Sequence, residues 1–316
     1  MKISPLYLAG LAVDAIDGLS AVGVRPPYVE TDDFVTGGVL DSKGRHWIVK
    51  APMNTTAATS LEAEAAIAPL LLEALRQGEL PFDIMRPAGF ANVAAGGRAI
   101  VYPEPIGTPG DFETMTSTGA REVGRAIASI HMLPTETIDH AGLPHYAAEE
   151  FRVRPLAELH DADQTRAIPS LLRRRWEDAL EDTELWEFEP AVLHGDIDSE
   201  NFLWSGGTIT AVLGFGGAHV GDPAVDFAPL LALPDPIFAA ILDSYENTRG
   251  VSVDESTQTR AILLSELSIA KWLLYGIRTE NDDVQHEARN MLTDLAADVE
   301  SDPSSQPEPT WDVDPS

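Results

Sequence analysis

The stretch that decides the fold is Ala191-Val192-Leu193-His194-Gly195-Asp196-Ile197-Asp198-Ser199-Glu200-Asn201-Phe202-Leu203-Trp204. Three apolar residues lead into a polar loop, and three further apolar residues follow it. Short apolar runs beside turn residues are typical of buried strands. A Gly206-Gly207 turn and another strand-like run over 208–213 come next. The loop over 194–201 should therefore be supported by short strands on both sides.

The spacing of polar residues within this loop indicates a chemistry. Asn201 follows Asp196 by five positions. In the catalytic loop of protein kinases, an Asp at this spacing accepts the proton of the substrate hydroxyl and the Asn binds Mg²⁺. A loop Asp taken alone is more often a capping residue satisfied by backbone N–H groups. His194 is open to an acid/base role, but we favour a buried histidine whose ring supports the loop through hydrogen bonds.

Residues 193–227, which end in Gly221-Asp222-Pro223-Ala224-Val225-Asp226-Phe227, resemble the signature region of the aminoglycoside and macrolide phosphotransferase superfamily. In general pattern they are most similar to its macrolide 2′-phosphotransferase-like branch. The likeness extends more loosely from Asp32 to about Val299. It includes Trp47-Ile48-Val49-Lys50-Ala51-Pro52, the helix that carries Glu64, Tyr102-Pro103-Glu104, and Gly124 to His131.

The resemblance implies both a fold and an activity. The implied fold is α+β and bilobal, like protein kinases, with a small sheet-rich N-terminal lobe and a larger, mostly helical C-terminal lobe. The implied activity is transfer of the γ-phosphoryl group of ATP or GTP, with Mg²⁺, to a hydroxyl of a small molecule such as a macrolide or aminoglycoside antibiotic. A kinase of a small metabolite, such as an amino sugar or choline, would use the same loop.

The resemblance also assigns roles to individual residues. Asp196 would be the catalytic base, or the residue that orients the hydroxyl, and Asn201 would be a metal ligand. Lys50 would hold the α- and β-phosphates while Glu64 pairs with it. Glu62 competes for the role of Glu64, because both lie near the start of one helix and the sequence alone does not set the register.

The segment from Val101 to Glu104 matches the linker between the lobes, so Tyr102 and Glu104 are assigned to nucleotide binding. In the family, backbone N–H and C=O groups of this linker meet the purine. Backbone recognition has no side-chain signature, and the choice between ATP and GTP stays open. The stretch from Asp33 to Gly38 would cover the phosphates, but it lacks a G-x-G-x-x-G pattern. Gly37-Gly38 is equally consistent with a β-bulge.

The sequence departs from the family at one position. Family members place a Mg²⁺-binding Asp after the strand that follows the catalytic loop, where this chain has Val212-Leu213-Gly214-Phe215. Mg²⁺ usually depends on one or two carboxylates, so Gly214 should weaken metal capture. This substitution supports an alternative function, a pseudokinase-like module that binds nucleotide but transfers phosphate poorly.

Two nearby acids are candidates to replace the missing ligand. Asp198 lies two residues beyond Asp196 and is either a substitute metal ligand or a solvated loop acid. Asp222 is interpreted as the N-cap of a helix that begins at Pro223. Asp226 would then lie inside that helix and face the catalytic loop as a hydrogen-bond acceptor.

The remainder of the chain suggests how the lobes are built. We expect an N-terminal nucleotide-binding lobe over 1–104, a helical lobe over 105–299 that contains the catalytic loop, and a disordered acidic tail over 300–316. Periodicity and turn residues predict a hairpin of 34–40 and 46–50, a helix over 60–75 capped by Ser60 and kinked or broken at Pro69, a strand over 98–102, a buried helix face at Val123, Ile127 and Ile130, and a helix over 169–185.

The composition limits the partners and the location. The chain has 316 residues, 44% of them apolar, no cysteine, and a formal net charge of −30. Such a charge argues against nucleic acid as a partner and would favour a cationic small molecule, although a solvated acidic surface is the more ordinary explanation of the charge. No apolar run is long enough to span a membrane, and no signal peptide is recognisable. We therefore expect a cytoplasmic protein.

Overall fold

The computed structural model describes residues 3–94 and 96–301. They form two compact units, the first made of residues up to Tyr146 together with Pro190–Val253, and the second of Ala147–Glu189 together with residues from Asp254. The lobe boundary expected near residue 105 falls inside the first unit and stays a prediction. None of the helices in the described part of the chain is long and apolar enough to cross a membrane.

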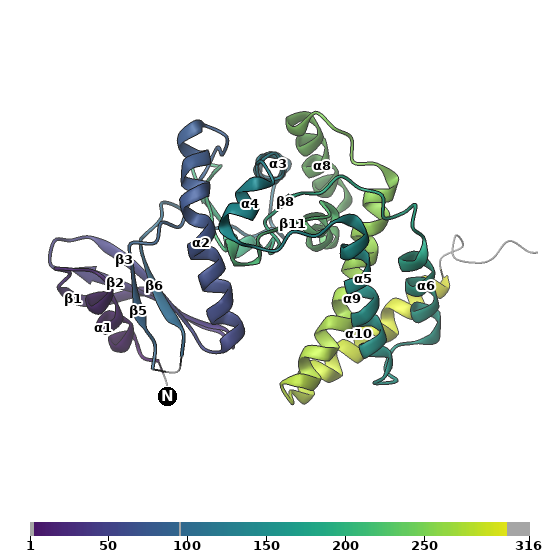
Figure 1. Ribbon diagram of the computed structural model, residues 1–316, viewed down its shortest axis with the longest axis horizontal. Coiled ribbons are helices and arrows are strands. Elements are labelled where there is room, and N and C mark those ends of the chain that lie inside the picture. The colour runs from purple at the N-terminus through teal and green to yellow at the C-terminus, as the bar shows by residue number, and fades with distance from the viewer. Residues whose placement is uncertain (1–2, 95, 302–316) are drawn as a thin grey trace, which may run out of the picture. The chain divides into compact units, whose positions relative to one another are not determined.

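A five-stranded antiparallel sheet forms the N-terminal part of the first unit (Figure 1). Its order is β1 (Ala21–Glu30), β2 (Phe34–Asp41), β3 (His46–Pro52), β6 (Arg98–Pro103) and β5 (Gly89–Asn92). The predicted hairpin and the predicted strand over 98–102 are both present. Asp41 closes the hairpin, because its carboxylate accepts hydrogen bonds from the backbone N–H groups of Lys43 and Arg45.

The two faces of this sheet pack against different helices. Val35, Val39 and Val49 belong to the core that includes α1 (Pro5–Ala15). Ile100 and Tyr102 pack with Leu61 of α2 (Thr55–Gln77), and Figure 1 shows α1 and α2 on opposite sides of the strands. Successive side chains of a strand point to opposite faces, so this alternation also fixes which strand residues reach α2.

Helix α2 begins earlier than predicted. The side chain of Asn54 accepts a hydrogen bond from the N–H of Ala57 and caps the helix. The prediction that Ser60 is the N-cap is therefore wrong, because Ser60 lies within the helix. Asn54 has the extended backbone and the side-chain oxygen that satisfy an otherwise unpaired N–H group. The helix also continues beyond Pro69 instead of breaking there.

Gly37 and Gly38 lie within β2 and not in the turn that precedes it. Opposite them, β1 has a register irregularity between Arg25 and Tyr28. A Cβ on Gly38 would come within 2.6 Å of the Pro26 carbonyl oxygen. Gly38 therefore makes room for the bulged strand β1, whereas a Cβ on Gly37 would lie 2.5 Å from the side chain of Leu8 in α1. The bulge lies in β1 and not at the two glycines themselves.

Short strands surround the loop at 194–201, as predicted. A four-stranded sheet has the order β4-β10-β9-β7, and a two-stranded sheet pairs β11 with β8. Their bounds are β4 (Asp83–Ile84), β7 (Thr108–Pro109), β8 (Ala191–Leu193), β9 (Phe202–Ser205), β10 (Thr208–Val212) and β11 (His219–Gly221). The loop leaves β8 and enters β9, so both of its ends are held by sheet.

The remaining helices of the first unit cover these strands. They are α3 (Ser117–His131), α4 (Glu136–Ala141), α7 (Ala224–Phe227) and α8 (Asp235–Arg249). Helix α3 packs against α8 and buries Val123, Ile127 and Ile130, the face that the periodicity predicted. The end of α3 thereby lies beside the catalytic loop and α7.

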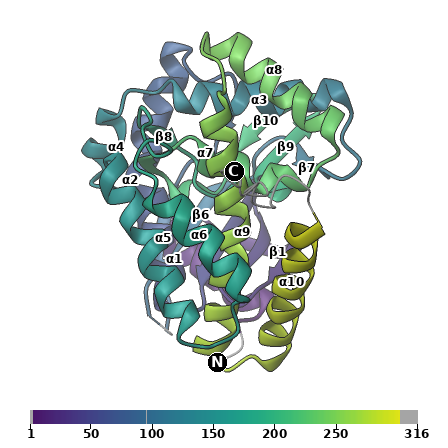
Figure 2. The same cartoon turned by 90° about the vertical axis from the view of Figure 1, so that its right-hand side faces the viewer.

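Helices are the regular secondary structure of the second unit in its described residues (Figure 2). It contains α5 (Ala148–Asp163), α6 (Ser170–Glu181), α9 (Glu255–Arg278) and α10 (Asp282–Ser301). Helix α6 is shorter than the predicted span over 169–185. Residues 300 and 301 are helical rather than part of a disordered tail, and 302–316 lie outside the described residues.

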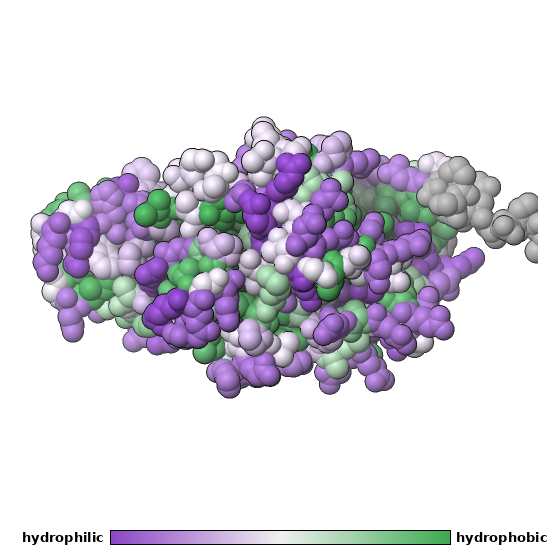
Figure 3. Space-filling model, turned by 90° about the horizontal axis from the view of Figure 1, so that it is seen from above, coloured by the Kyte–Doolittle hydropathy of each residue, from purple (hydrophilic) through white to green (hydrophobic). Residues whose placement is uncertain are grey.

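The two units together confirm the predicted α+β class, with a sheet-rich N-terminal part and a mostly helical C-terminal part. Hydrophilic residues dominate the face seen in Figure 3, with scattered apolar residues between them. Such a surface agrees with the large excess of acidic residues, 51 against 21 basic ones.

Candidate active site

His194 supports the loop from beneath, as predicted. Its ring is fully buried, and its Nε2–H donates a 2.6 Å hydrogen bond to the carbonyl of Leu213. Its Nδ1 accepts a hydrogen bond from the N–H of Asp196 at 3.2 Å. Because the carbonyl can only accept and the amide can only donate, these partners fix the neutral tautomer. Both ring nitrogens are engaged, so His194 positions the loop.

Asp196 and Asn201 are brought together at the surface of the loop. The Asn201 side-chain amide donates to the backbone carbonyl of Asp196 at 2.9 Å and to its carboxylate at 3.4 Å. Asp196 itself is exposed. An exposed carboxylate on a fixed loop can reach the proton of an incoming hydroxyl.

Asp226 anchors the loop from the buried side. Its carboxylate accepts hydrogen bonds from the backbone N–H groups of His194 at 2.8 Å and Gly195 at 2.9 Å. Burial by itself would raise the pKa of Asp226, but hydrogen bonds and charge interactions with His131, His194 and Gly195 hold that pKa below its usual value. This confirms that Asp226 acts as an acceptor for the loop.

A buried chain of polar groups continues from Asp226 toward the end of α8. The Nε2–H of His131 donates to Asp226 at 3.0 Å, and its Nδ1 accepts from the hydroxyl of Tyr245 at 2.9 Å. The guanidinium of Arg249 donates to the same hydroxyl. Burial lowers the pKa of His131 although the Asp226 carboxylate opposes this, and burial raises the pKa of Tyr245 to about 12.

Sequence reasoning missed the roles of His131 and Tyr245. The signal at His131 was weak: a histidine at the last position of an otherwise apolar helix face. Tyr245 lies on a helix more than a hundred residues away in sequence, and nothing in its local pattern marks it.

Lys50 and Glu64 form an ion pair below the sheet. The ammonium of Lys50 lies 3.5 Å from the carboxylate of Glu64, which is almost completely buried. The hydroxyl of Tyr102 donates to the other carboxylate oxygen of Glu64 at 2.7 Å. Burial, together with Glu64, raises the pKa of Tyr102 well above its usual value. Lys50 also lies 4.4 Å from the centre of the Phe34 ring.

Glu62, the competing candidate, points elsewhere. It is exposed and pairs with Arg98, whose Nε donates to its carboxylate at 2.8 Å. The hydrogen bonds from Arg98 lower the pKa of Glu62. The geometry therefore brings Glu64, and not Glu62, to Lys50.

Glu104 is tied to the sheet by both its backbone and its side chain. Its N–H donates to the carbonyl of His46 at 3.1 Å. Its carboxylate accepts from Arg25 at 2.5 Å and contacts the His46 ring at 2.9 Å. The backbone N–H of Glu104 therefore already has a partner within the sheet.

The turn that follows β10 lies directly against the catalytic loop. Gly214 has φ +79°, in the left-handed region, and a Cβ placed there would lie 2.5 Å from the side-chain oxygen of Asn201. Phe215 packs its ring 4.7 Å from that of His194. A Cβ on Gly216 would lie 2.1 Å from the Ser60 hydroxyl of α2, so the turn also contacts this helix.

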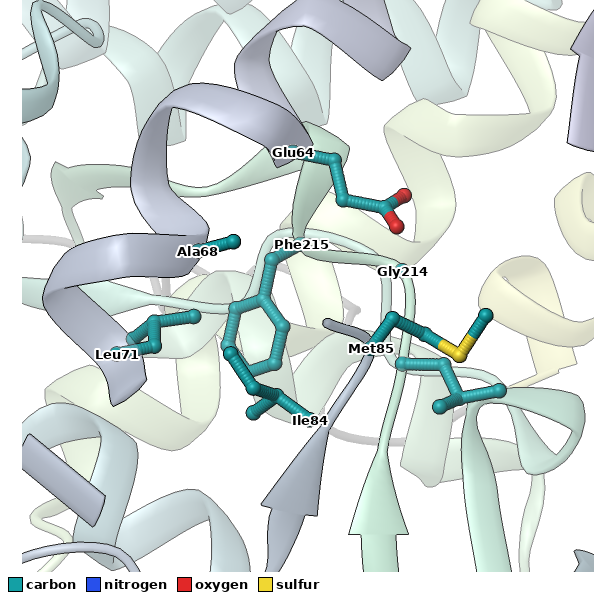
Figure 4. Close-up of a pocket in the computed structure, with 8 residues that line it drawn as sticks. Glu64, Ala68, Leu71, Ile84, Met85, Gly214 and Phe215 are labelled. Atoms are coloured by element: carbon teal, nitrogen blue, oxygen red, sulfur yellow. The ribbon is translucent and has the colours of Figure 1, made fainter. Parts of the chain in front are cut away.

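A small pocket lies between α2, β4 and this turn (Figure 4). The pocket is open to solvent, and the empty space within it and at its mouth amounts to about 200 Å³. Its lining is apolar apart from Glu64, and Figure 4 shows the Phe215 ring beside Leu71 and Ile84. No carboxylate other than Glu64 lines the pocket.

The two acids that the sequence offers as substitutes for the missing metal ligand have other partners. Asp198 accepts a hydrogen bond from the N–H of Glu200 at 2.8 Å and starts a short 3₁₀ turn. Asp222 is buried and accepts from the N–H of Ala224 at 3.0 Å. It therefore satisfies the start of α7, which begins one residue after the predicted Pro223.

The Mg²⁺ ion that the kinase motif implies does not fit the residues present. Position 214 has no side chain, and the remaining oxygen donors near it are the amide of Asn201 and the carboxylate of Asp196. In the part of the chain that the structure describes, no group of three or more His, Cys, Asp or Glu side chains is placed to hold a metal ion. Mg²⁺ prefers carboxylate ligands.

Comparisons with known proteins place this geometry in context. Residues 38–261 match the model of the family described as "Phosphotransferase enzyme family". The solved structure of macrolide 2′-phosphotransferase MphH from Brachybacterium faecium has a TM-score of 0.75 at 22% identity, covering 92% of this chain and 98% of that chain. No curated protein sequence matches the chain.

Two further solved structures share the fold. Macrolide 2′-phosphotransferase type I has a TM-score of 0.72 at 19% identity, covering 87% of this chain and 92% of its own. The GDP and kanamycin complex of APH(2″)-IIIa has a TM-score of 0.74 at 20% identity, covering 93% of this chain and 99% of its own.

Proposed function

The chain belongs to the phosphotransferase enzyme family, and from that premise we propose that it transfers the γ-phosphoryl group of a nucleoside triphosphate to a hydroxyl of a small molecule. The observation that carries the proposal is the conjunction of two features in one compact unit. The first is the ion pair between the partly buried Lys50 and the buried Glu64, and the second is the anchored loop that presents Asp196. Phosphoryl transfer needs both a cation for the phosphates and a carboxylate for the hydroxyl.

Each residue has a defined part in this reaction. Lys50 holds the α- and β-phosphates, and Glu64 fixes the position of its ammonium. Asp196 accepts the hydrogen bond of the acceptor hydroxyl and takes its proton as the new O–P bond forms. The bond between the γ-phosphorus and the bridging oxygen breaks, and the nucleoside diphosphate leaves. Asn201 and Asp226 hold the loop in place throughout.

The linker after β6 supports GTP as the donor. Pro103 and Pro105 have no N–H group, and the N–H of Glu104 is bound to His46, so residues 103–105 offer a base only carbonyl oxygens. Adenine needs a donor for its N1 acceptor, whereas N1–H and the N2 amino group of guanine are donors. The neighbouring APH(2″)-IIIa is described as a GDP complex.

A donor competition tests this choice. With equal concentrations of GTP and ATP, we expect GTP to be consumed at least about fivefold faster, since a lost hydrogen bond costs on the order of 1 kcal/mol or more. The Pro105→Ala variant introduces an N–H group and should narrow the difference, while Pro109→Ala, in the short strand β7, is the matched control. Equal use of both donors would remove the linker from base selection.

The acceptor is proposed to be a cationic, hydroxyl-bearing antibiotic of the macrolide or aminoglycoside class. The net charge of −30 favours association with cations, and structural neighbours are described as macrolide phosphotransferases or as a kanamycin complex. Because the donor is a nucleoside triphosphate, we place the reaction in the cytoplasm.

One observation favours a second function. Gly214 stands where kinases have a metal-binding Asp, which supports a module that binds nucleotide but transfers phosphate poorly. To separate the two, the purified full-length chain is given GTP or ATP with Mg²⁺ or Mn²⁺ and a panel of macrolides and aminoglycosides. A product heavier by one phosphoryl group in mass spectrometry, absent in Asp196→Asn, supports the transferase. Nucleotide binding without product from any pairing supports the module.

A further inference from the structure

The position that faces Asn201 carries no side-chain carboxylate. Gly214 is the residue that faces Asn201 there, and it contributes only backbone. Building on the proposed function, we infer that this site takes up the nucleoside triphosphate as the metal-free polyanion and gains little affinity from Mg²⁺. The ligand class is thus a triphosphate without its usual divalent cation.

The charges near the site explain this preference. In kinases the Asp at this position repels the phosphates unless a metal ion lies between them, so nucleotide binding depends on the metal. Here no Asp at position 214 repels the phosphates. Among the ion pairs of the described residues, Glu64 is the one carboxylate that pairs with the ammonium of Lys50. One cation then faces the phosphates directly.

No neighbouring acid restores the missing ligand. Asp198 is used in capping the short turn before Asn201. Asp222 and Asp226 are completely buried, and their oxygens accept hydrogen bonds from backbone N–H groups. Releasing either carboxylate toward a metal would leave those N–H groups unsatisfied.

The local backbone is also fitted to the absence of a side chain. Asn201 is held by its two hydrogen bonds to Asp196, and its oxygen occupies the space where a Cβ at Gly214 would begin. The positive φ of Gly214 further favours glycine, although Asp and Asn tolerate it better than most residues. The packing therefore fits Gly214, and a side chain at this position requires the end of the Asn201 side chain to shift.

Binding of a non-hydrolysable GTP analogue, measured by calorimetry on the full-length chain with EDTA or with Mg²⁺, tests the inference. We expect the two Kd values of the wild type to agree within about threefold, because one neutral amide ligand adds little to metal capture. Gly214→Asp should weaken binding in EDTA and make binding at least about tenfold tighter with Mg²⁺ than without, the scale of one metal-ligand contact.

Two control variants separate charge from shape. Gly214→Asn has nearly the same shape as Gly214→Asp but no charge, so it should show no new metal dependence. Gly44→Asp places the same residue at a similar φ of +74°, with nothing within 4 Å of its Cβ, and should bind like wild type. Thermal unfolding of each variant checks that it is folded.

The outcomes are distinguishable. A wild type that loses tenfold or more in affinity when Mg²⁺ is removed overturns the inference but leaves the proposed function intact. A Gly214→Asp variant that folds and gains no metal dependence also overturns it. Failure of the wild type to bind both the GTP analogue and the corresponding ATP analogue, with and without Mg²⁺, removes the nucleotide site, and with it the proposed function.

Discussion

The two sides of the catalytic loop differ in how completely they are built. On the buried side, the Asp226 carboxylate accepts hydrogen bonds from two backbone N–H groups and from the ring of His131. Asp226, His131 and Tyr245 are all buried. On the open side, Gly214 presents no functional group to Asn201. The difference teaches that holding the loop and capturing a metal are separate tasks, and that this chain retains the first without the second.

The largest expected effect comes from the exposed tip of the loop. Asp196→Asn should reduce transfer by about 10³-fold, because general base catalysis typically contributes 10²–10⁴. Stability should barely change, since the carboxylate is exposed. Turnover is measured by mass spectrometry and folding by thermal unfolding. Full turnover in the folded variant would show that Asp196 takes no part in the reaction.

Removing the buried anchor should destabilise the protein strongly. Asp226→Ala leaves two loop N–H groups and the ring of His131 without an acceptor, for a loss on the order of 3 kcal/mol or more in the free energy of unfolding. Asp243→Ala, on the exposed side of α8, is the matched control and should cost less than about 0.5 kcal/mol. Equal losses in urea unfolding would mean that Asp226 does not anchor the loop.

The phosphate-binding pair offers a smaller, more local test. Glu64→Gln removes the charge beside Lys50 while keeping an acceptor for Tyr102, and should weaken nucleotide binding by about tenfold. Glu62→Gln alters a carboxylate in the same helix that pairs with Arg98, and should leave nucleotide affinity unchanged. Titration of the nucleotide analogue measures both. A larger loss in Glu62→Gln would reverse the assignment.

The features that the sequence predicted well are local ones. The hairpin of β2 and β3 and the strands on either side of the loop follow from apolar runs and turn residues within a few positions of each other. The support that His194 gives the loop was also predicted, and one of its partners, Asp196, lies two residues away, whereas the other, Leu213, lies 19 residues away, after β10.

Features that local patterns do not settle depend on packing over long distances. The family resemblance assigned Glu64 to Lys50 and left Glu62 as its competitor, and the packing of α2 against the sheet brings Glu64 to Lys50. The N-cap at Asn54 was missed. The bond between His131 and Asp226 joins residues 95 positions apart and exists only because α3 ends beside α7. Local patterns carry no information on such contacts.

The smallest expected effect is on how the stability of the protein depends on pH, and it tests the buried hydrogen bonds behind the catalytic loop. The pKa of His131 lies below its ordinary value because burial disfavours the charged ring. As the pH falls through about 6.5, the unfolded chain takes up a proton on this histidine and the folded protein does not. The contribution to stability is therefore complete above that pH and is lost as the pH falls, by up to about 1.4 kcal/mol per pH unit.

Replacing His131 isolates its share of this loss from that of the other histidines. His131→Gln keeps a donor for Asp226 and cannot titrate, so its unfolding temperature should fall less than that of wild type between pH 7.5 and 5.5. The low pKa of Asp226 also makes the protein less stable as the pH falls, but only at pH values below the ordinary carboxyl pKa. It therefore does not affect the comparison between pH 7.5 and 5.5. Parallel curves for the two proteins would mean that His131 takes up its proton equally in both states, and the buried chain from Arg249 to Asp226 would then tolerate a charged ring. A difference that grows as the pH falls would instead show that the anchor requires a neutral ring.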